Sequence, residues 1–175
     1  MVGFYSEEEL IQMGFGSVGT NVLLSTKAAV YGVKNIHLGD NVRIDDFCVL
    51  AAFGGTLTFE GYNHLGAFCY VNSAATVTFA MFSGLSSRCS IYSASDNYDG
   101  SCLTNPTVPS QYSEIKKGPV YIGRHVIIGC NTTVLPNCRI EDGSAIGACS
   151  LVTRDIPSGK IAAGVPARVV KNRKQ

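Results

Sequence analysis

Tryptophan is absent from this sequence, charge is scarce, and neither sign of charge is in excess. Charged residues make up 15% of the 175 residues, and 14 Lys and Arg stand against 13 Asp and Glu. A net charge of +1 lacks the basic excess of nucleic-acid-binding proteins, so nucleic acid is not an expected partner. The length suits one domain, residues 1–175, with a hydrophobic core of its own.

Long apolar runs and long amphipathic helices are missing as well. No run approaches the ~18 apolar residues of a transmembrane helix, and no basic segment followed by an apolar one opens the chain. The seven cysteines form no C-x-x-C pair, and their odd number leaves at least one thiol unpaired. We therefore expect a cytoplasmic protein that neither inserts into a membrane nor binds a metal.

What the sequence does contain is a six-residue repeat. Bulky apolar residues recur every six positions, without a break, at Ile122, Ile128, Val134, Ile140, Ile146 and Val152. Four earlier triplets have the same spacing once gaps between triplets are allowed: Val18, Leu24, Val30; Leu38, Ile44, Leu50; Phe59, Leu65, Val71; and Phe79, Leu85, Ile91. Four residues after each apolar position, 14 of 18 sites carry Ala, Ser, Thr, Cys or Val. Three hexads predict one triangular coil, and six stacked coils predict a β-solenoid over 18–156.

The departures from this repeat are also informative. A 25-residue excursion of about 97–119 follows the fourth coil, and loops of that length in a compact domain are usually functional. Before the repeat, in residues 1–17, Ser6 and Glu9 form a capping box that predicts a short helix to about Met13, covering the open end of the solenoid. After it, residues 157–175 form a tail in which the cations are Lys160, Arg168, Lys171, Arg173 and Lys174.

The same register separates the cysteines into two groups. Cys48, Cys69, Cys89 and Cys138 occupy the small inward place, where we expect them to pack as compact apolar residues. Cys102, Cys130 and Cys149 fall in the excursion or at corners, where we expect more exposure.

Two further segments carry a family resemblance. They are Ile146-Gly-Ala-Cys-Ser-Leu-Val-Thr-Arg-Asp-Ile-Pro and Ala163-Gly-Val-Pro-Ala-Arg-Val-Val-Lys. Together with the hexads and the excursion, they resemble the hexapeptide-repeat acyltransferases, most of all the maltose and galactoside acetyltransferases and related sugar acetyltransferases of surface-polysaccharide pathways. The resemblance implies an all-β, left-handed parallel β-helix and a homotrimer. It also implies that acetyl-CoA binds between two subunits, with the excursion reaching the neighbour.

Carried over position by position, the resemblance implies a set of acetyl-CoA contacts. Small residues would lie along the pantetheine arm and cations near the phosphates: Cys130, Gly147, Ala148, Thr153, Arg154 and Lys171.

One position departs from the family pattern. The family string Ile-Tyr-Thr-Ala-Thr-His ends in the general base, whereas the corresponding string here is Ile91-Tyr-Ser-Ala-Ser-Asp96. An Asp of ordinary pKa, about 4, is poorly matched to deprotonating a sugar hydroxyl at neutral pH. A neutral amine needs no such activation, because it sheds its proton after attack. Asp96 therefore favours transfer to an amino sugar.

His125, in the coil after the excursion, is the other candidate base. For the acceptor we expect contacts from the corner pair Asp45 and Asp46, and from Asn72, Arg88, Tyr98 and Tyr112. Asp45 and Asp46 suit an amino or hydroxyl sugar, and Arg88 suits a nucleotide diphosphate. Asp at a corner is also ordinary turn chemistry.

We therefore predict an acetyl-CoA-dependent N-acetyltransferase acting on a nucleotide-linked amino-dideoxy sugar, by direct attack in a ternary complex. One alternative is a sugar O-acetyltransferase in which Asp96 or His125 is a true base. A second is a β-helix scaffold without catalysis. The sequence leaves open which sugar and which nucleotide, dTDP, UDP or GDP, is used.

Overall fold

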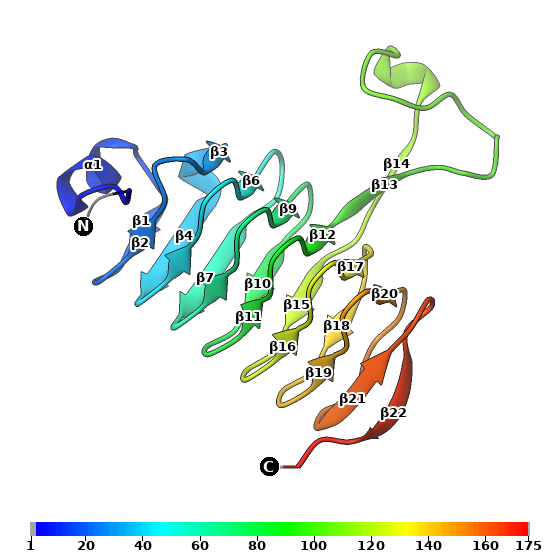
Figure 1. Cartoon of the computed structure of the whole chain (residues 1–175). Helices are drawn as coiled ribbons and strands as arrows, with labels where there is room; N and C mark the ends of the chain where they lie inside the picture. The colour runs from blue at the N-terminus through cyan, green and yellow to red at the C-terminus, as the bar shows by residue number, and fades with distance from the viewer. Residues whose placement is uncertain (1–2, 175) are drawn as a thin grey trace.

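The computed structural model describes residues 3–174, which wind into a three-sided parallel β-helix (Figure 1). The first sheet contains β1 (Ser17–Val18), β4 (Ile36–Asp40), β7 (Leu57–Gly61), β10 (Val77–Phe79), β15 (Val120–Ile122) and β18 (Arg139–Ile140). The second contains β2 (Leu23–Leu24), β5 (Arg43–Ile44), β8 (His64–Leu65), β11 (Gly84–Leu85), β16 (Ile127–Ile128), β19 (Ala145–Ile146), β21 (Lys160–Ala163) and β22 (Arg168–Asn172). The third contains β3 (Ala29–Tyr31), β6 (Val49–Ala51), β9 (Tyr70–Asn72), β12 (Ser90–Tyr92), β17 (Thr133–Val134) and β20 (Leu151–Val152).

The six-residue register predicted from the sequence is confirmed in all three sheets. Val18, Leu38, Phe59, Phe79, Ile122 and Ile140 pair in one ladder of the first sheet. Leu24, Ile44, Leu65, Leu85, Ile128 and Ile146 do so in the second, and Val30, Leu50, Val71, Ile91, Val134 and Val152 in the third. All of these except Val18 and Val30 are buried. Six complete coils form as expected, and Ile156 and β21 begin a seventh through pairing with Ile140 and β19.

The interior of the prism is a column of side chains from successive coils. Phe59 and Phe79, both buried, stack at 4.8 Å between ring centroids. Cys48, Cys69, Cys89 and Cys138 are buried, and burial raises the pKa of the Cys138 thiol to about 11, so their predicted packing role is confirmed. Cys130 and Cys149 are exposed and Cys102 is half-buried, also as predicted. Each buried Leu, Ile, Val or Phe stabilises the fold by about 1.5–3 kcal/mol, so the ladder is the main source of stability.

Both ends of the prism are covered. At the N-terminal end, α1 (Glu7–Gln12) begins at the predicted capping box, in which Ser6 N donates to Glu9 Oε2 at 2.7 Å and Glu9 N to Ser6 Oγ at 3.2 Å. Leu10 of this helix is buried against the core. A 3-10 turn, η1 (Val33–Asn35), precedes β4. At the other end β22 folds back antiparallel on β21, so much of the predicted tail is a sheet strand. None of the helices in residues 3–174 is long and apolar enough to cross a membrane.

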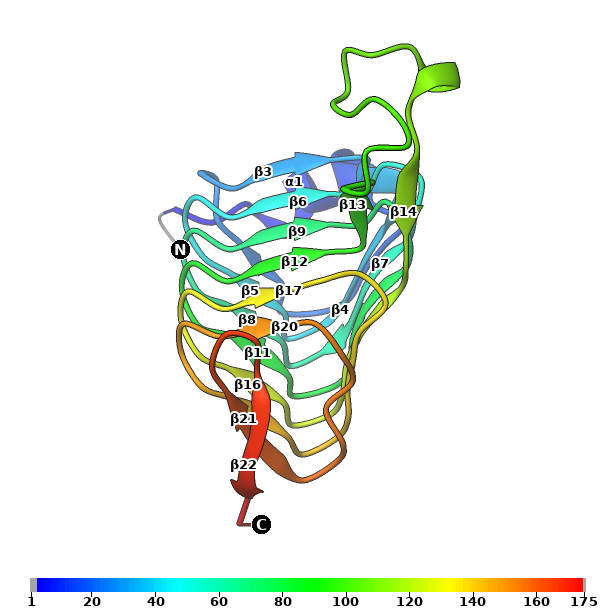
Figure 2. The same cartoon turned by 90° about the vertical axis from the view of Figure 1, so that its right-hand side faces the viewer.

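The excursion is a hairpin that projects from the prism (Figures 1 and 2). Its arms are β13 (Ala94–Asp96) and β14 (Ile115–Lys117), which pair antiparallel, and a 3-10 turn, η2 (Ser110–Tyr112), lies near its tip. Gly118 N donates to Ser93 O at 2.9 Å where the hairpin leaves the prism. The excursion therefore begins earlier than the predicted residue 97, and Asp96 lies on the hairpin and not in the last strand of a coil.

Candidate active site

A groove of about 580 Å³ lies on the outer face of the second sheet. Its floor contains Asp45, Gly66 and Ser86, which lie one above another in three successive coils. Each follows directly after a residue of the second-sheet ladder, namely Ile44, Leu65 and Leu85. Gly66 has no side chain, so space remains between Asp45 and Ser86. A Cβ at Gly66 would lie 2.8 Å from the backbone N of Ser87, so the close approach of the next coil requires glycine there. Tyr62, Phe82 and His125 form one wall.

The predicted acidic pair is divided between two environments. Asp45 faces the groove, and its carboxylate accepts from His64 Nε2 at 2.8 Å and from Arg43 Nε at 2.7 Å. Burial opposes ionisation of Asp45, but these two donors outweigh it and hold its pKa below the ordinary value. Asp46 instead accepts from Ser25 Oγ at 2.6 Å and Lys27 Nζ at 2.8 Å, which lower its pKa. Its carboxylate is occupied on the preceding coil, and Asp46 does not line the groove.

A second cavity, of about 420 Å³, lies at the base of the hairpin. It brings together three of the predicted residues, Asp96, Asn72 and Tyr98. Within residues 3–174 the half-buried Asp96 carboxylate makes no hydrogen bond or ion pair, although Ser95 Oγ donates to the Asp96 main-chain carbonyl at 3.1 Å. Asp96 is thus free to contact a ligand, which Asp45 and Asp46 are less able to do.

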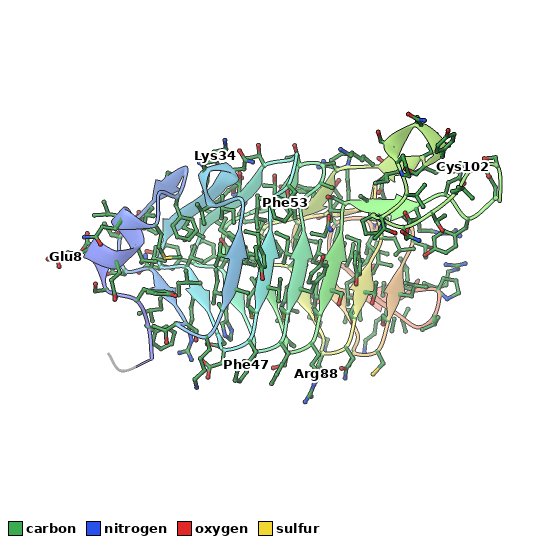
Figure 3. All side chains as sticks on the ribbon, turned by 90° about the horizontal axis from the view of Figure 1, so that it is seen from above. Glu8, Lys34, Phe47, Phe53, Arg88 and Cys102 are labelled. Carbon is green, nitrogen blue, oxygen red and sulfur yellow. The ribbon has the colours of Figure 1, made fainter. Side chains whose placement is uncertain are left out.

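Two predicted acceptor residues lie outside both cavities. Arg88 lies on the edge between the second and third sheets, the same long edge as Phe47, with its guanidinium 5.4 Å from the Phe68 ring centroid (Figure 3). Tyr112 ends η2 near the hairpin tip and, with Cys102, lines a separate cavity there. Figure 3 shows Cys102 on this projecting segment. The structure does not bring either residue next to Asp96 or the groove.

The groove and the Asp96 cavity belong to different parts of one chain. The groove lies on the second sheet, whereas Asp96 leaves the prism after the third sheet, and the two cavities share no lining residue. A single chain therefore does not place Asp96 beside Ser86 or His125.

The residues expected to contact acetyl-CoA lie on the C-terminal coils. Cys130, Gly147 and Ala148 follow the second-sheet strands β16 and β19, and Cys149 N donates to Cys130 O at 2.8 Å between the two coils. Thr153 and Arg154 follow β20 and are exposed, as is Lys171 on β22. The small residues therefore lie at the corner after the second sheet, whereas Thr153 and Arg154 lie after the third sheet and Lys171 lies on β22.

The histidines differ in their surroundings. His125 lies in the groove wall with its ring stacked on Phe82, at 5.1 Å between centroids. His64 is bound to Asp45, and His37 Nδ1 lies 3.1 Å from Ser17 Oγ. No group of three or more His, Cys, Asp or Glu side chains suited to a metal occurs within residues 3–174.

Several groove residues were not among the predicted site residues, including Ser86, Tyr62, Phe82 and Arg173. Ser86 was detectable in principle, because it is the first residue after an inward-facing hexad residue in a middle coil. Arg173 appeared in the sequence only as a tail cation. In the structure its Nη1 donates to the carbonyls of His125 at 2.8 Å, Ser144 at 2.9 Å and Gly143 at 3.3 Å.

Comparison with known proteins identifies the family. Residues 119–154 match the family model "Bacterial transferase hexapeptide (six repeats)". The chain is 43% identical over 172 residues, 98% of this chain and 90% of the relative, to dTDP-4-amino-4,6-dideoxy-D-glucose acyltransferase of Escherichia coli. It is 30% identical over 143 residues, 78% of this chain and 71% of the relative, to the putative lipopolysaccharide biosynthesis O-acetyl transferase WbbJ of Escherichia coli K12.

A solved structure covers the whole chain. It is AntD, an N-acyltransferase from Bacillus cereus in complex with dTDP-4-amino-4,6-dideoxyglucose and coenzyme A, with a TM-score of 0.94, 42% identity, and coverage of 100% of this chain and 93% of that one. Another AntD structure holds dTDP and 3-hydroxybutyryl-CoA. Variants of AntD were solved with either a serine or an aspartate replaced, and these positions are ten residues apart in AntD. Ser86 and Asp96 have that same spacing here.

Proposed function

Because the chain belongs to the hexapeptide-repeat acyltransferases, we propose that it transfers an acyl group from coenzyme A to the amino group of a dTDP-linked 4-amino-4,6-dideoxyhexose. The observation that carries this proposal is Asp96, whose carboxylate lies in a cavity without a hydrogen-bond partner among residues 3–174. It stands at the position where the sugar O-acetyltransferases that the sequence resembles have a histidine base. A carboxylate is matched to an amine nucleophile, which needs orientation before attack and loses its proton afterwards.

The separation of the two cavities supports a site shared by two subunits. We propose a homotrimer in which the hairpin of one subunit brings Asp96 to the groove of its neighbour, where Ser86 and Asp45 face the acceptor. Arg88 and Tyr112, exposed on the edge and on the hairpin, then lie where subunits meet and contribute there. Closed cyclic symmetry would repeat this contact three times.

The reaction is direct acyl transfer in a ternary complex. The sugar amine attacks the thioester carbonyl, the C–S bond breaks, and an amide and free coenzyme A result. Asp96 orients the amine and accepts the proton that the nitrogen loses, and the coenzyme A thiolate takes up a proton as it leaves. Much of the rate comes from holding the amine and the thioester at bonding distance. Donors such as the Ser86 hydroxyl stabilise the developing oxyanion.

Acyl-CoA is the co-substrate, and the C-terminal coils supply its surface. Small side chains at Cys130, Gly147 and Ala148 allow the thin pantetheine arm to lie flat, and Thr153, Arg154 and Lys171 are exposed near its phosphates. Surface-polysaccharide synthesis is the setting that the O-acetyl transferase relative supports. Seven free thiols suit the reducing cytoplasm, where we place the enzyme.

A substrate panel tests this function. The protein is incubated with acetyl-CoA and with dTDP-4-amino-4,6-dideoxyglucose or its 4-hydroxy counterpart, and free thiol is followed. We expect thiol release with the amino sugar only. Release with the hydroxy sugar alone would establish an O-acetyltransferase, and no coenzyme A binding at all would leave a scaffold. Longer acyl-CoA thioesters in the same assay define the acyl chain.

A further inference from the structure

Seven residues form a vertical column along the edge between the first and second sheets. Each lies two residues before the first paired residue of a second-sheet strand. In order along the prism, the column consists of Asn21, Asn41, Tyr62, Phe82, His125, Gly143 and Gly159. All seven have a positive φ, between 53° and 72°. Asn and Gly adopt this conformation readily, whereas bulky side chains rarely do.

Within this column, the bulky residues occur only beside the groove. Tyr62, Phe82 and His125 occupy the third, fourth and fifth coils, whose residues line the groove, while the outer coils use Asn or Gly. Phe47, Phe68 and Arg88 adopt the same conformation on the edge between the second and third sheets, so this wall is distinguished by the groove beside it as well as by backbone strain. The choice of three aromatic rings along one wall therefore points to a ligand with a flat face.

The rings stack on one another, and the stack is open at one end. Centroids lie 4.9 Å apart between Tyr62 and Phe82, and 5.1 Å apart between Phe82 and His125. The next place in the column is Gly143, which carries no side chain, and a Cβ built there would have no neighbour nearer than 4.0 Å. A cavity of about 370 Å³ lies here, lined by His125, Gly143, Arg173 and Lys174. The stack of rings therefore has room for one more flat group, over Gly143.

The charge around this place suits phosphate. Arg173 is held by three carbonyls through Nη1, and its Nη2 and Nε make no hydrogen bond to any residue of 3–174. Lys174 lies beside it, and the nearby Asp142 carboxylate is paired with Arg124 at 3.6 Å. His125 and Arg173 line both this cavity and the groove, so the two adjoin.

We propose that the pyrimidine base of the acceptor nucleotide occupies the place above Gly143 and stacks on the open face of His125, with its diphosphate beside Arg173. This inference rests on the proposed function. The place of Gly143 lies two coils and four residues from Ser86, or roughly 15 Å at ~4.8 Å per coil and ~3.3 Å per residue. That distance suits an extended nucleoside diphosphate sugar whose hexose reaches Ser86.

Equilibrium binding of dTDP, without acyl-CoA, tests the stacking. His125→Asn removes the ring and introduces Asn, which already adopts the positive φ of this column at Asn21 and Asn41. Gly143→Asn places a side chain of the same kind in the space over Gly143. We expect each variant to bind dTDP about tenfold or more weakly, the range of one base–aromatic stack. His125→Phe restores a ring and should retain affinity. Phe47→Asn removes a ring from the stacked Phe47–Phe68 pair on another edge and should leave dTDP binding unchanged.

Kinetics separate this role from catalysis. With the amino sugar, His125→Asn should raise KM for the nucleotide sugar and leave kcat at saturation and KM for acyl-CoA unchanged. The inference is overturned if both Asn variants bind dTDP within twofold of the wild type, or if coenzyme A affinity falls instead, which would assign the place to adenine. A different result would separate this inference from the proposed function. If the wild type and the variants bind dTDP as expected but the wild type does not acylate the amino sugar, the proposed function is refuted and the stacking of the base on His125 is not.

Discussion

The prism and the hairpin hold their acidic residues in opposite ways. On the prism, Asp45 is bound by His64 and Arg43, and its place is set by a ladder that extends through every coil. On the hairpin, the Asp96 carboxylate makes no hydrogen bond or ion pair within residues 3–174, and its strand pairs with the other arm. In the proposed function, the prism supplies the binding surface, whereas the hairpin supplies Asp96, which acts at the groove of a neighbouring subunit.

Truncating one aromatic residue in each region should separate stability from activity most clearly. Phe79→Ala opens a cavity beside Phe59, so we expect a loss of about 3–5 kcal/mol in the free energy of unfolding. Tyr98, on the hairpin, is 90% exposed, and Tyr98→Ala should leave stability unchanged while weakening the acceptor contact. Urea unfolding at one fixed protomer concentration measures the free energy of unfolding of both variants. Equal destabilisation by Phe79→Ala and Tyr98→Ala would contradict the assignment of stability to the prism and not to the hairpin.

Replacing the hairpin carboxylate should have the next largest effect. We expect Asp96→Asn to lower kcat/KM for the amino sugar by about 100-fold or more, since a positioned base typically contributes at least that much. Affinities for dTDP and coenzyme A should stay near the wild-type values, as binding titrations will show. A kcat/KM within threefold of the wild type would remove Asp96 from the mechanism.

Mixed trimers test whether the two regions meet between subunits. Ser86→Ala and Asp96→Asn subunits, each defective alone, are co-expressed with different tags and purified as mixed oligomers. If each site takes Ser86 from one subunit and Asp96 from another, one site in every mixed trimer is intact, which restores about a third of the sites. Activity no greater than the mean of the two parent variants would place the whole site within one chain.

The smallest effect concerns the prism carboxylate. The folded-state pKa of Asp45 is lowered, so its contribution to stability is present above the unfolded pKa of about 3.9 and is lost as pH falls through the folded value. Asp45→Asn should therefore destabilise the protein by about 1 kcal/mol at pH 7. Urea unfolding near pH 7 and near pH 3 checks this difference, which should shrink at the lower pH. A difference of the same size at both pH values would refute the ionic contribution.

The hexads predicted the core closely because inward side chains obey a local rule. Each apolar residue such as Ile122 or Leu85 points inward whichever coil lies above it, so its burial follows from spacing alone. Asp96 was also identified from the sequence, because a family string ends there. The sequence does not show that Asp46 and Asp45 meet different partners, because successive side chains at a corner point in different directions and meet different coils.

The sequence by itself determined the fold, the register, the inward cysteines, the capped helix and the residue that departs from a histidine base. Only the tertiary structure decided which outward side chains share a surface. Phe82 and His125 stack although the whole excursion separates them, and Gly143 lies next to His125 only because one coil is 18 residues long there. The physical reason is that inward neighbours are fixed by a six-residue period, whereas outward neighbours come from other coils and depend on every insertion between them.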